Sequence, residues 1–285
     1  MQRKYINNNS RNFGPLPASA KKNYIWQNMI SKNKIKFLIT LQKKKVREEE
    51  NLYIIEGDKL VREFLAAGIK VKTVYAKPEF ISSLPASLKK SAEEIEAVTF
   101  DDLRQISTLK TPHNALAVIP VIQNEFAASS VFSSLCVALD FVQDPGNLGT
   151  IIRAAAWFGI KNIVCSETCV DVYNPKVIQS CMGAILHVNV NYTDLNSFLL
   201  EAEKKKIPVY GTLLEGKSVY DHPLSEKGII LLGNESKGIS DNLLQFVSEK
   251  IVIPKFSTAK YGIDSLNVSM AASVVFSEFA RRSFS

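Results

Sequence analysis

The sequence predicts an α/β protein whose larger, C-terminal part contains a parallel β-sheet. Short apolar runs alternate with amphipathic segments along most of the 285 residues, which is the pattern of strands that alternate with helices. Because a helix separates each predicted strand from the next, parallel pairing follows. The C-terminal strands are expected near 135–140, 162–165, 187–192, 207–212, 229–233 and 250–253, and the helices near 148–158, 175–183, 194–206, 240–247 and 266–282.

The N-terminal part predicts a smaller α/β domain at residues 29–122. The spacing of Ile35, Leu38, Ile39 and Leu41 indicates an amphipathic helix after Ser31. The remaining segments of this domain are expected to be a strand at 53–57, a helix at 58–67, a strand at 71–75, an extended segment at 98–100, a helix at 101–107 and a strand at 115–120.

The segments outside these domains are predicted from their composition. Residues 1–28 are polar and rich in Asn and lack periodicity, so we expect a disordered basic arm, with Met29 as an alternative start. Residues 123–134 are expected to be a linker, and residues 135–285 form the second domain.

Positive charge is concentrated at the N-terminal end. Residues 1–47 contain twelve basic side chains and no acidic one, and residues 131–285 hold 14 basic and 15 acidic side chains. Lys43, Lys44, Lys45 and Arg47 are therefore candidates for contact with RNA phosphates. A solvated helix face or an organellar transit peptide would also account for this composition.

Composition argues against several classes of protein. No apolar run reaches the roughly 18 to 20 residues that span a bilayer, and the N-terminus has no apolar signal core, so we expect a cytoplasmic protein. The four cysteines form no CxxC pair and the three histidines are scattered, so neither a zinc site nor a disulfide framework is expected.

Three segments carry polar residues that suit a site. Ile253-Pro254 precedes a loop and then Ser265-Leu266-Asn267-Val268-Ser269, which opens an apolar helix and is either a helix cap or part of a ligand site. Earlier, the predicted strand at 135–139 leads through a polar loop into a helix with one charge, Arg153, whose guanidinium either faces a ligand or extends to solvent. The strand at 229–233 runs into the glycine-flanked loop 233–240, where a backbone can approach a ligand closely.

Together these segments resemble the SpoU/TrmH family of RNA ribose 2'-O-methyltransferases, within the SPOUT clan. The family's first motif pairs an Asn with an Arg six positions later, as Asn147 and Arg153 stand here. Its second motif is Gly-x-Glu-x-x-Gly, matched by Gly233, Glu235 and Gly238, and its third joins Ile253-Pro254 to Ser265–Ser269. The loop between Pro254 and Ser265 is longer than is usual in the family. The resemblance covers residues 135–285.

The resemblance implies a fold and a cofactor. SpoU domains contain a deep trefoil knot, bind S-adenosylmethionine, need no metal and usually work as homodimers with the active site at the subunit interface. The N-terminal domain resembles, more loosely, the L30e-like substrate-binding domain of many members, through Glu56-Gly57 and the segment 112–117. By resemblance, the residues expected to bind the cofactor are Thr212, Gly233, Ile253, Pro254, Leu266 and Ser269.

The resemblance also implies catalytic roles. Arg153 is expected near the target hydroxyl, as a phosphate clamp or as a base, with Asn147, Glu235, Ser265 and Asn267 around it. The substrate is expected to be RNA, more readily rRNA than tRNA. Three alternatives stay open: a base methyltransferase of the same clan, a non-catalytic RNA-binding module, and a nicotinamide dehydrogenase suggested faintly by the segment 144–149, which lacks GxGxxG spacing.

Overall fold

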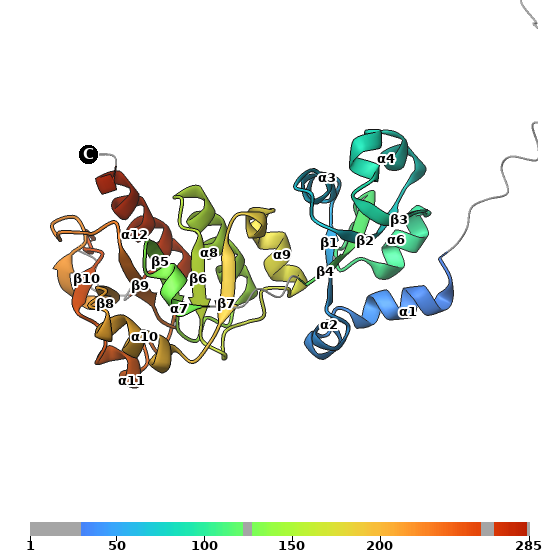
Figure 1. Ribbon diagram of the computed structural model, residues 1–285. Coiled ribbons are helices and arrows are strands. Elements are labelled where there is room, and N and C mark those ends of the chain that lie inside the picture. Colours follow the sequence, from blue (N-terminus) through green and yellow to red (C-terminus); the bar gives the residue numbers. More distant parts are fainter. Residues whose placement is uncertain (1–29, 122–126, 258–264, 284–285) are drawn as a thin grey trace, which may run out of the picture.

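The computed structural model describes residues 30–121, 127–257 and 265–283, and these form two α/β domains (Figure 1). The expected basic arm at 1–28 lies outside the described residues. Among the described residues, no helix is long and apolar enough to cross a membrane.

The N-terminal domain is a four-stranded mixed sheet in the order β1-β4-β2-β3. The β1–β4 and β4–β2 pairs are antiparallel, and the β2–β3 pair is parallel. Apolar side chains pack on both faces of this sheet, in two separate clusters. Its elements are α1 (Lys32–Thr40), α2 (Lys44–Glu50), β1 (Leu52–Glu56), α3 (Asp58–Ala66), β2 (Val71–Ala76), α4 (Pro78–Ser82), α5 (Ala86–Lys89), β3 (Ala92–Ala97), α6 (Phe100–Ile106) and β4 (Ala115–Pro120).

The third strand of this domain is β3, whereas the sequence predicted an extended segment at 98–100. The segment 98–100 is not extended through its length, because Thr99 caps α6 through a capping box with Asp102. The Thr99 hydroxyl accepts from the Asp102 amide at 3.1 Å, and the Asp102 carboxylate accepts from the Thr99 amide at 2.9 Å. The strand itself is β3, whose three glutamates at an exposed sheet edge hide the usual apolar alternation.

The C-terminal domain is a six-stranded, all-parallel sheet in the order β10-β8-β9-β5-β6-β7. Its strands are β5 (Leu135–Leu139), β6 (Asn162–Cys165), β7 (Asn189–Tyr192), β8 (Val209–Ser218), β9 (Gly228–Leu232) and β10 (Glu249–Val252). The order reverses between β5 and β9, and the loops at their carboxyl ends diverge there, which is where open parallel sheets bind ligands.

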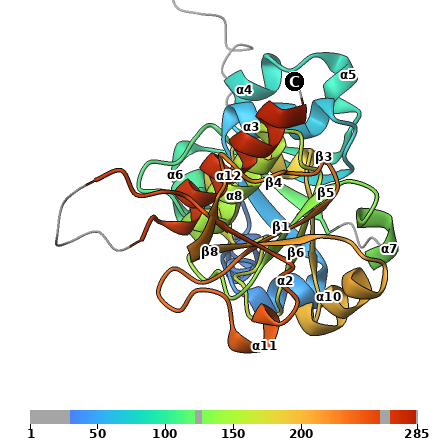
Figure 2. The same cartoon turned by 90° about the vertical axis from the view of Figure 1, so that its left-hand side faces the viewer.

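Helices cover both faces of this sheet. The core cluster on one face contains side chains of α8 (Pro145–Trp157), α9 (Pro175–Cys181) and α12 (Val268–Ser283), and a short 3₁₀ turn, η2 (Ala184–Leu186), follows α9. The cluster on the other face contains side chains of α7 (Ala128–Val131), α10 (Leu195–Lys204) and α11 (Asp241–Leu244). Figures 1 and 2 show α8 and α12 beside each other, in agreement with their contacts.

Part of the segment expected to be a linker belongs to this second core. Val131 and Phe132 are buried, and the Phe132 ring stacks on Phe198 of α10 with 5.4 Å between ring centroids. The folded C-terminal unit therefore begins before β5.

The end of α12 is held by a buried carboxylate. Glu278, 6% exposed, accepts hydrogen bonds from Arg281 at 2.7 and 2.9 Å and from Arg282 at 2.9 Å, and Arg282 also donates to the Tyr220 carbonyl. The hydrogen bonds from Arg281 lower the pKa of Glu278 from its ordinary 4.5 to about 2, against the opposing effect of burial.

This depressed pKa predicts a pH-dependent loss in the Glu278→Gln variant. A carboxylate whose pKa is lowered in the folded protein stabilises the fold at any pH above the pKa that it has in the unfolded chain. This stabilisation is lost as the pH falls toward about 2. We expect the substitution to cost about 1–3 kcal/mol at pH 7 and progressively less between pH 5 and pH 2, measured by urea unfolding. A cost that stays constant with pH would contradict this, and Glu203→Gln, at an exposed position, is the control.

Candidate functional site

The candidate site lies at the carboxyl ends of β5, β9 and β10. Three segments meet there: the β5–α8 loop (residues 140–144), the β9–α11 loop (residues 233–240) and the start of α12. They are the three segments that the sequence singled out, and residues 258–264 between β10 and α12 lie outside the described residues.

A chain of side-chain hydrogen bonds joins the three segments. The amide nitrogen of Asn147, in the first turn of α8, donates to the Glu235 carboxylate of the β9–α11 loop. The Asn267 amide nitrogen donates to the Asn147 side-chain oxygen at 3.0 Å. Asn147 is thus the central residue of the network, and it is only partly exposed.

The position of Asn147 is set by the cap of α8. Asp144 is the N-cap, and its carboxylate accepts from the Asn147 backbone amide at 2.9 Å, while Pro145 supplies the fixed φ of the first helical position. On the next element, the Asn267 oxygen accepts from the Ser269 amide at 2.9 Å and from the Ser269 hydroxyl at 2.7 Å. The cap interpretation therefore applies to Asn267, but its amide nitrogen still serves the network.

The β9–α11 loop is a tight, internally bonded turn. Asn234 and Gly238 exchange two backbone hydrogen bonds of 2.9 Å each, and the Asn234 side-chain oxygen accepts from the Ser236 and Lys237 amides. Gly233 lies directly against Gly238: a Cβ there would collide with the Gly238 carbonyl and the next backbone nitrogen. Glu235 is held at the top of this turn.

Arg153 stands apart from the network. Its side chain is exposed, and in the described part of the chain it makes no hydrogen bond or ion pair that would occupy the guanidinium. It lies six residues beyond Asn147, which is about 9 Å of helix rise. Glu235 is hydrogen-bonded to Asn147 and not to Arg153. An exposed Arg153 agrees with the alternative in which its guanidinium extends to solvent. The apolar residues of α8 face the sheet and Arg153 faces outward, followed one turn later by Trp157, 83% exposed.

The residues expected to bind a cofactor come from β8, β9, β10 and α12. β8 pairs with β10 up to Gly211 and again from Lys217, so residues 212–216 are not paired with β10 and bulge out at this edge of the sheet. Ile253 and Pro254 are half-buried where β10 ends, and Leu266 is 48% exposed. Ser265 is exposed, and Ser269 is buried with its hydroxyl engaged by Asn267.

Comparison with known proteins identifies the chain. The model of the SpoU rRNA methylase family matches residues 134–277, and that of an MRM3-like substrate-binding domain matches residues 32–117. A Bacillus subtilis protein, 23S rRNA (guanosine(2553)-2'-O)-methyltransferase RlmP, is 30% identical over 85% of this chain and 94% of its own length. This chain belongs to the SpoU rRNA methylase family.

Other relatives agree with this assignment. Human rRNA methyltransferase 3, mitochondrial, is 25% identical over 83% of this chain and 69% of its own length. The structure of an AdoMet-bound rRNA methyltransferase from Sinorhizobium meliloti superposes with a TM-score of 0.77 at 25% identity, covering 89% of this chain and 96% of that one. A TrmH-family protein from Porphyromonas gingivalis superposes with a TM-score of 0.79 at 35% identity, covering 89% and 99%.

The predicted family, reaction class and cofactor are thereby confirmed: the SpoU chain is an S-adenosylmethionine-dependent RNA methyltransferase. One feature of its own site fits such a cofactor. The Thr212 hydroxyl is buried and, among the described residues, has no hydrogen-bond partner. Buried hydroxyls are normally paired, so this one is suited to a polar group of a bound ligand at the point where β8 leaves its pairing with β10.

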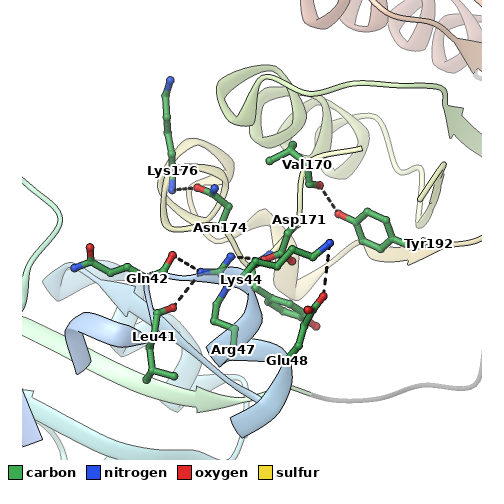
Figure 3. Close-up of polar contacts among 11 residues, drawn as sticks. Leu41, Gln42, Lys44, Arg47, Glu48, Val170, Asp171, Asn174, Lys176 and Tyr192 are labelled. Carbon is green, nitrogen blue, oxygen red and sulfur yellow. Dashed lines mark hydrogen bonds and ion pairs between the residues drawn. The ribbon is translucent and has the colours of Figure 1, made fainter. Parts of the chain in front are cut away.

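The basic residues near α2 divide into two groups. Lys43, Lys44 and Lys45 are exposed, and the last two form only weak pairs with Glu48 and Glu49, at 3.6 and 3.8 Å. Arg47 is corrected. Its side chain is buried and bonded to Asp171 of the SpoU domain, so it is not available to an RNA phosphate (Figure 3).

Two residues that support the SpoU site were missed as candidates. Asp140 is buried, and its carboxylate accepts from the Ser240 amide at 2.8 Å, which ties the β5–α8 loop to the far end of the β9–α11 loop. The Asn234 side chain donates to the Phe141 carbonyl at 3.0 Å, between the same two loops. An acid directly after a buried strand was the available signal for Asp140.

The β5–α8 loop is also hydrogen-bonded to the thiol of Cys169. The Val142 amide donates to Cys169 at 3.3 Å, and Cys169 donates to the Leu139 carbonyl at 3.3 Å. A hydrogen bond from Cys165 lowers the pKa of the Cys169 thiol to about 7, against the opposing effect of burial. The thiol thus anchors the backbone that leads into the α8 cap.

Proposed function

We propose that this SpoU protein methylates the ribose 2'-hydroxyl of a nucleotide in rRNA. The observation that carries the proposal is the Asn147–Glu235–Asn267 network, because it gathers the three family motifs at the switch point of the parallel sheet. The name of the B. subtilis relative assigns that protein a guanosine 2'-O position in 23S rRNA.

The chemistry requires positioning and proton removal. S-adenosylmethionine supplies an electrophilic methyl group on a sulfonium sulfur. The 2'-oxygen forms the new bond to the methyl carbon as the carbon–sulfur bond breaks, and the hydroxyl proton leaves to a base. The roles fall to this chain's polar residues: Asn147 and Asn267 orient one another, Glu235 holds Asn147, and Ser265 is exposed two residues before Asn267.

We assign Arg153 as a clamp on the RNA phosphate next to the target ribose. A guanidinium stays protonated in proteins and presents a fork that matches phosphate oxygens, so the clamp is favoured over the role of base. Its exposure and its lack of a partner among the described residues support this assignment. Thr212, Gly233, Ile253, Pro254, Leu266 and Ser269 remain the proposed cofactor contacts.

We propose a homodimer that buries the outer face of α8 and α12. Trp157 at the end of α8 is 83% exposed and Met270 in the first turn of α12 is 59% exposed, on two helices that pack side by side. Large apolar side chains that are exposed in the monomer favour an interface. Arg153 lies one turn from Trp157 and would then be brought to the site of the second copy.

The finer features of the fold are also proposals. β10 lies at one edge of the sheet and α12 packs on α8, an arrangement compatible with the deep trefoil knot of SPOUT proteins. We keep an L30e-like fold for residues 29–122, a basic arm at 1–28 and a catalytic domain at 135–285. Of the expected linker, 123–134, the part from Val131 onward joins the catalytic domain, because Val131 and Phe132 are buried in its core. A cytoplasmic location is proposed, with mitochondria as the alternative because of the mitochondrial relatives.

The test is methyl transfer to an rRNA transcript in which the target nucleotide carries either a ribose or a 2'-deoxyribose. We expect labelled methyl from S-adenosylmethionine to enter the ribose transcript alone. Transfer to the deoxy substrate would make the acceptor a base and would move the protein to the neighbouring class. Binding of the transcript without any transfer would favour the non-catalytic RNA-binding module.

The exposed lysines of α2 predict a salt effect. Replacement of Lys43, Lys44 and Lys45 by Gln should weaken RNA binding and flatten the log–log salt dependence by about 0.7–0.9 for each RNA phosphate that α2 no longer neutralises, while cofactor affinity stays unchanged. The measurement is RNA affinity at several salt concentrations. Lys204→Gln, an exposed lysine on α10, is the control, and an unchanged slope in the triple variant would contradict phosphate binding by α2.

A further inference from the structure

The two domains are joined by a buried ion pair. The Arg47 side chain of α2 is 4% exposed, and that of Asp171, in the segment between β6 and α9, is 15% exposed. The Arg47 guanidinium donates to the Asp171 carboxylate through Nε at 3.1 Å and through Nη2 at 2.5 Å. Its remaining nitrogen donates to the carbonyls of Leu41 and Gln42 at 3.0 and 2.7 Å (Figure 3).

All three nitrogens of this guanidinium therefore donate hydrogen bonds within the protein. The guanidinium ties the carboxyl end of α1 to the start of α2 within its own domain and ties both to the catalytic domain. A buried charge is stable only when its partner remains in place, so separation of the domains would leave Arg47 unpaired. The pair favours one docked arrangement over a loose tether.

Apolar contacts surround the pair. The Tyr53 ring of β1 contacts the Tyr173 ring with 4.5 Å between centroids. Ile178 of α9 is 2% exposed and belongs to the core cluster of the N-terminal domain, with Ile185 and Leu186 packed against it. The catalytic domain thus contributes side chains to the core of the substrate-binding domain, which is the packing of a fixed joint.

The Asp171 side of the joint is connected to the candidate site. The neighbouring Val170 amide donates to the Val142 carbonyl of the β5–α8 loop at 2.9 Å, and the Val170 carbonyl accepts from the Tyr192 hydroxyl at 2.6 Å. Val142 is two residues from Asp144, the cap that places Asn147. The ion pair is therefore one backbone hydrogen bond away from the loop that builds the site.

The Arg47 side of the joint is connected to the basic surface. Lys43, Lys44 and Lys45 stand at the start of α2 with exposed side chains, whereas Arg47 points inward from the same helix. The start of this short helix thus presents lysines to solvent, and Arg47 on the same helix binds Asp171 of the catalytic domain.

We infer that Arg47 and Asp171 are positioning residues that hold the substrate-binding domain, with its α2 lysines, at a set distance from the catalytic loop, and so decide which ribose of the bound RNA reaches the site. This inference rests on the proposed RNA methyltransferase function. Neither residue contacts the reacting atoms. A loosened joint lets the RNA bind in several registers, and misplacement by about 1 Å can cost a hundredfold in rate.

The test uses the full chain and compares Asp171→Asn with Glu96→Gln. Glu96 is a matched control: it pairs with Lys34 at 2.6 Å, its side chain is 18% exposed, and the pair lies within one domain. The first readout is the kinetics on an rRNA transcript that the wild-type protein methylates. We expect Asp171→Asn to raise KM for RNA by about tenfold or more and to spread methylation over neighbouring riboses, with cofactor affinity within about twofold of wild type. Glu96→Gln should change none of these.

The second readout measures the joint without activity. Nitroxide labels at Ser87→Cys and Glu203→Cys, one exposed position in each domain, report the distance between the domains, and the four native cysteines are buried. The distance distribution should be narrow in the labelled parent and in its Glu96→Gln form, and broad in Asp171→Asn. The double variant Arg47→Met with Asp171→Leu, which leaves no buried charge unpaired, should narrow the distribution again and recover most of the KM.

Each outcome bears on the inference. An Asp171→Asn variant with wild-type KM, wild-type site choice or a narrow distribution would overturn it, and so would a double variant as impaired as the single one. A parent protein that methylates no RNA would refute the proposed function, and the positioning role with it, whereas normal parent turnover with an insensitive Asp171→Asn variant would refute the positioning role alone.

Discussion

Arg153→Ala is expected to slow methyl transfer severely while leaving the fold intact. The guanidinium is exposed and has no partner among the described residues, so its loss leaves no stranded charge and should change the free energy of unfolding by less than about 0.5 kcal/mol. Loss of a cation that holds the RNA phosphate in the transition state should reduce kcat by about 10²–10³-fold or more. Thermal unfolding beside a methyl-transfer assay measures both quantities.

The control is Arg104→Ala, an exposed arginine of α6 that pairs with Asp101 of the same helix at 3.2 Å. It should retain turnover, since it lies outside the candidate site and pairs with Asp101 of its own helix. S-adenosylmethionine affinity, measured by calorimetry, should stay at the wild-type value in both variants. An Arg153→Ala protein that melts normally and turns over at a rate near wild type would defeat the catalytic assignment. A large fall in its stability would instead indicate a structural arginine.

Gly233→Ala is expected to remove cofactor binding by displacing the β9–α11 loop. The added Cβ meets backbone atoms of Gly238 and Ile239, which cannot swing aside as a flexible side chain would. Separating Gly233 from Gly238 breaks the tight turn that holds Glu235, and overpacking of this kind costs about 1–3 kcal/mol. The measurements are calorimetric titration with S-adenosylmethionine and urea unfolding.

A second glycine of the same turn is the matched control. Gly238 has φ +71°, and a Cβ there would meet nothing within 4 Å. Asn tolerates this left-handed conformation, so Gly238→Asn should bind the cofactor nearly as well as the wild-type protein. Equal loss in both variants would mean that the loop responds to any substitution, and retained binding in Gly233→Ala would contradict its assignment to the cofactor pocket.

The candidate site was largely predictable because its geometry follows from parallel strands. Asn147, Glu235 and Asn267 each stand just after a strand or at a helix start, and the carboxyl ends of parallel strands meet at one edge. What could not be predicted was the pairing. Glu235 bonds Asn147 and leaves Arg153 exposed, because six residues along a helix turn two side chains to different directions.

The errors at α2 and β3 have related causes. The run of basic residues predicted a charged surface, but α2 was not foreseen, so nothing indicated that Arg47 points away from Lys43 and Lys45. β3 was missed because its core-facing side chains are few, and its place in the sheet depends on pairing with β2.

The sequence by itself determined the alternation of strands and helices in the C-terminal domain, the helix cap within residues 265–269, and the three motifs that identify the family. These are short-range properties, set by periodicity and by hydrogen bonds within a few residues. Only the tertiary structure decided that Arg47 meets Asp171 across 124 residues, that Arg153 faces outward, and that the Thr212 hydroxyl is buried without a partner in the described chain. The physical reason is that burial and ion pairing depend on which distant segments pack together, and that choice is made by the whole core.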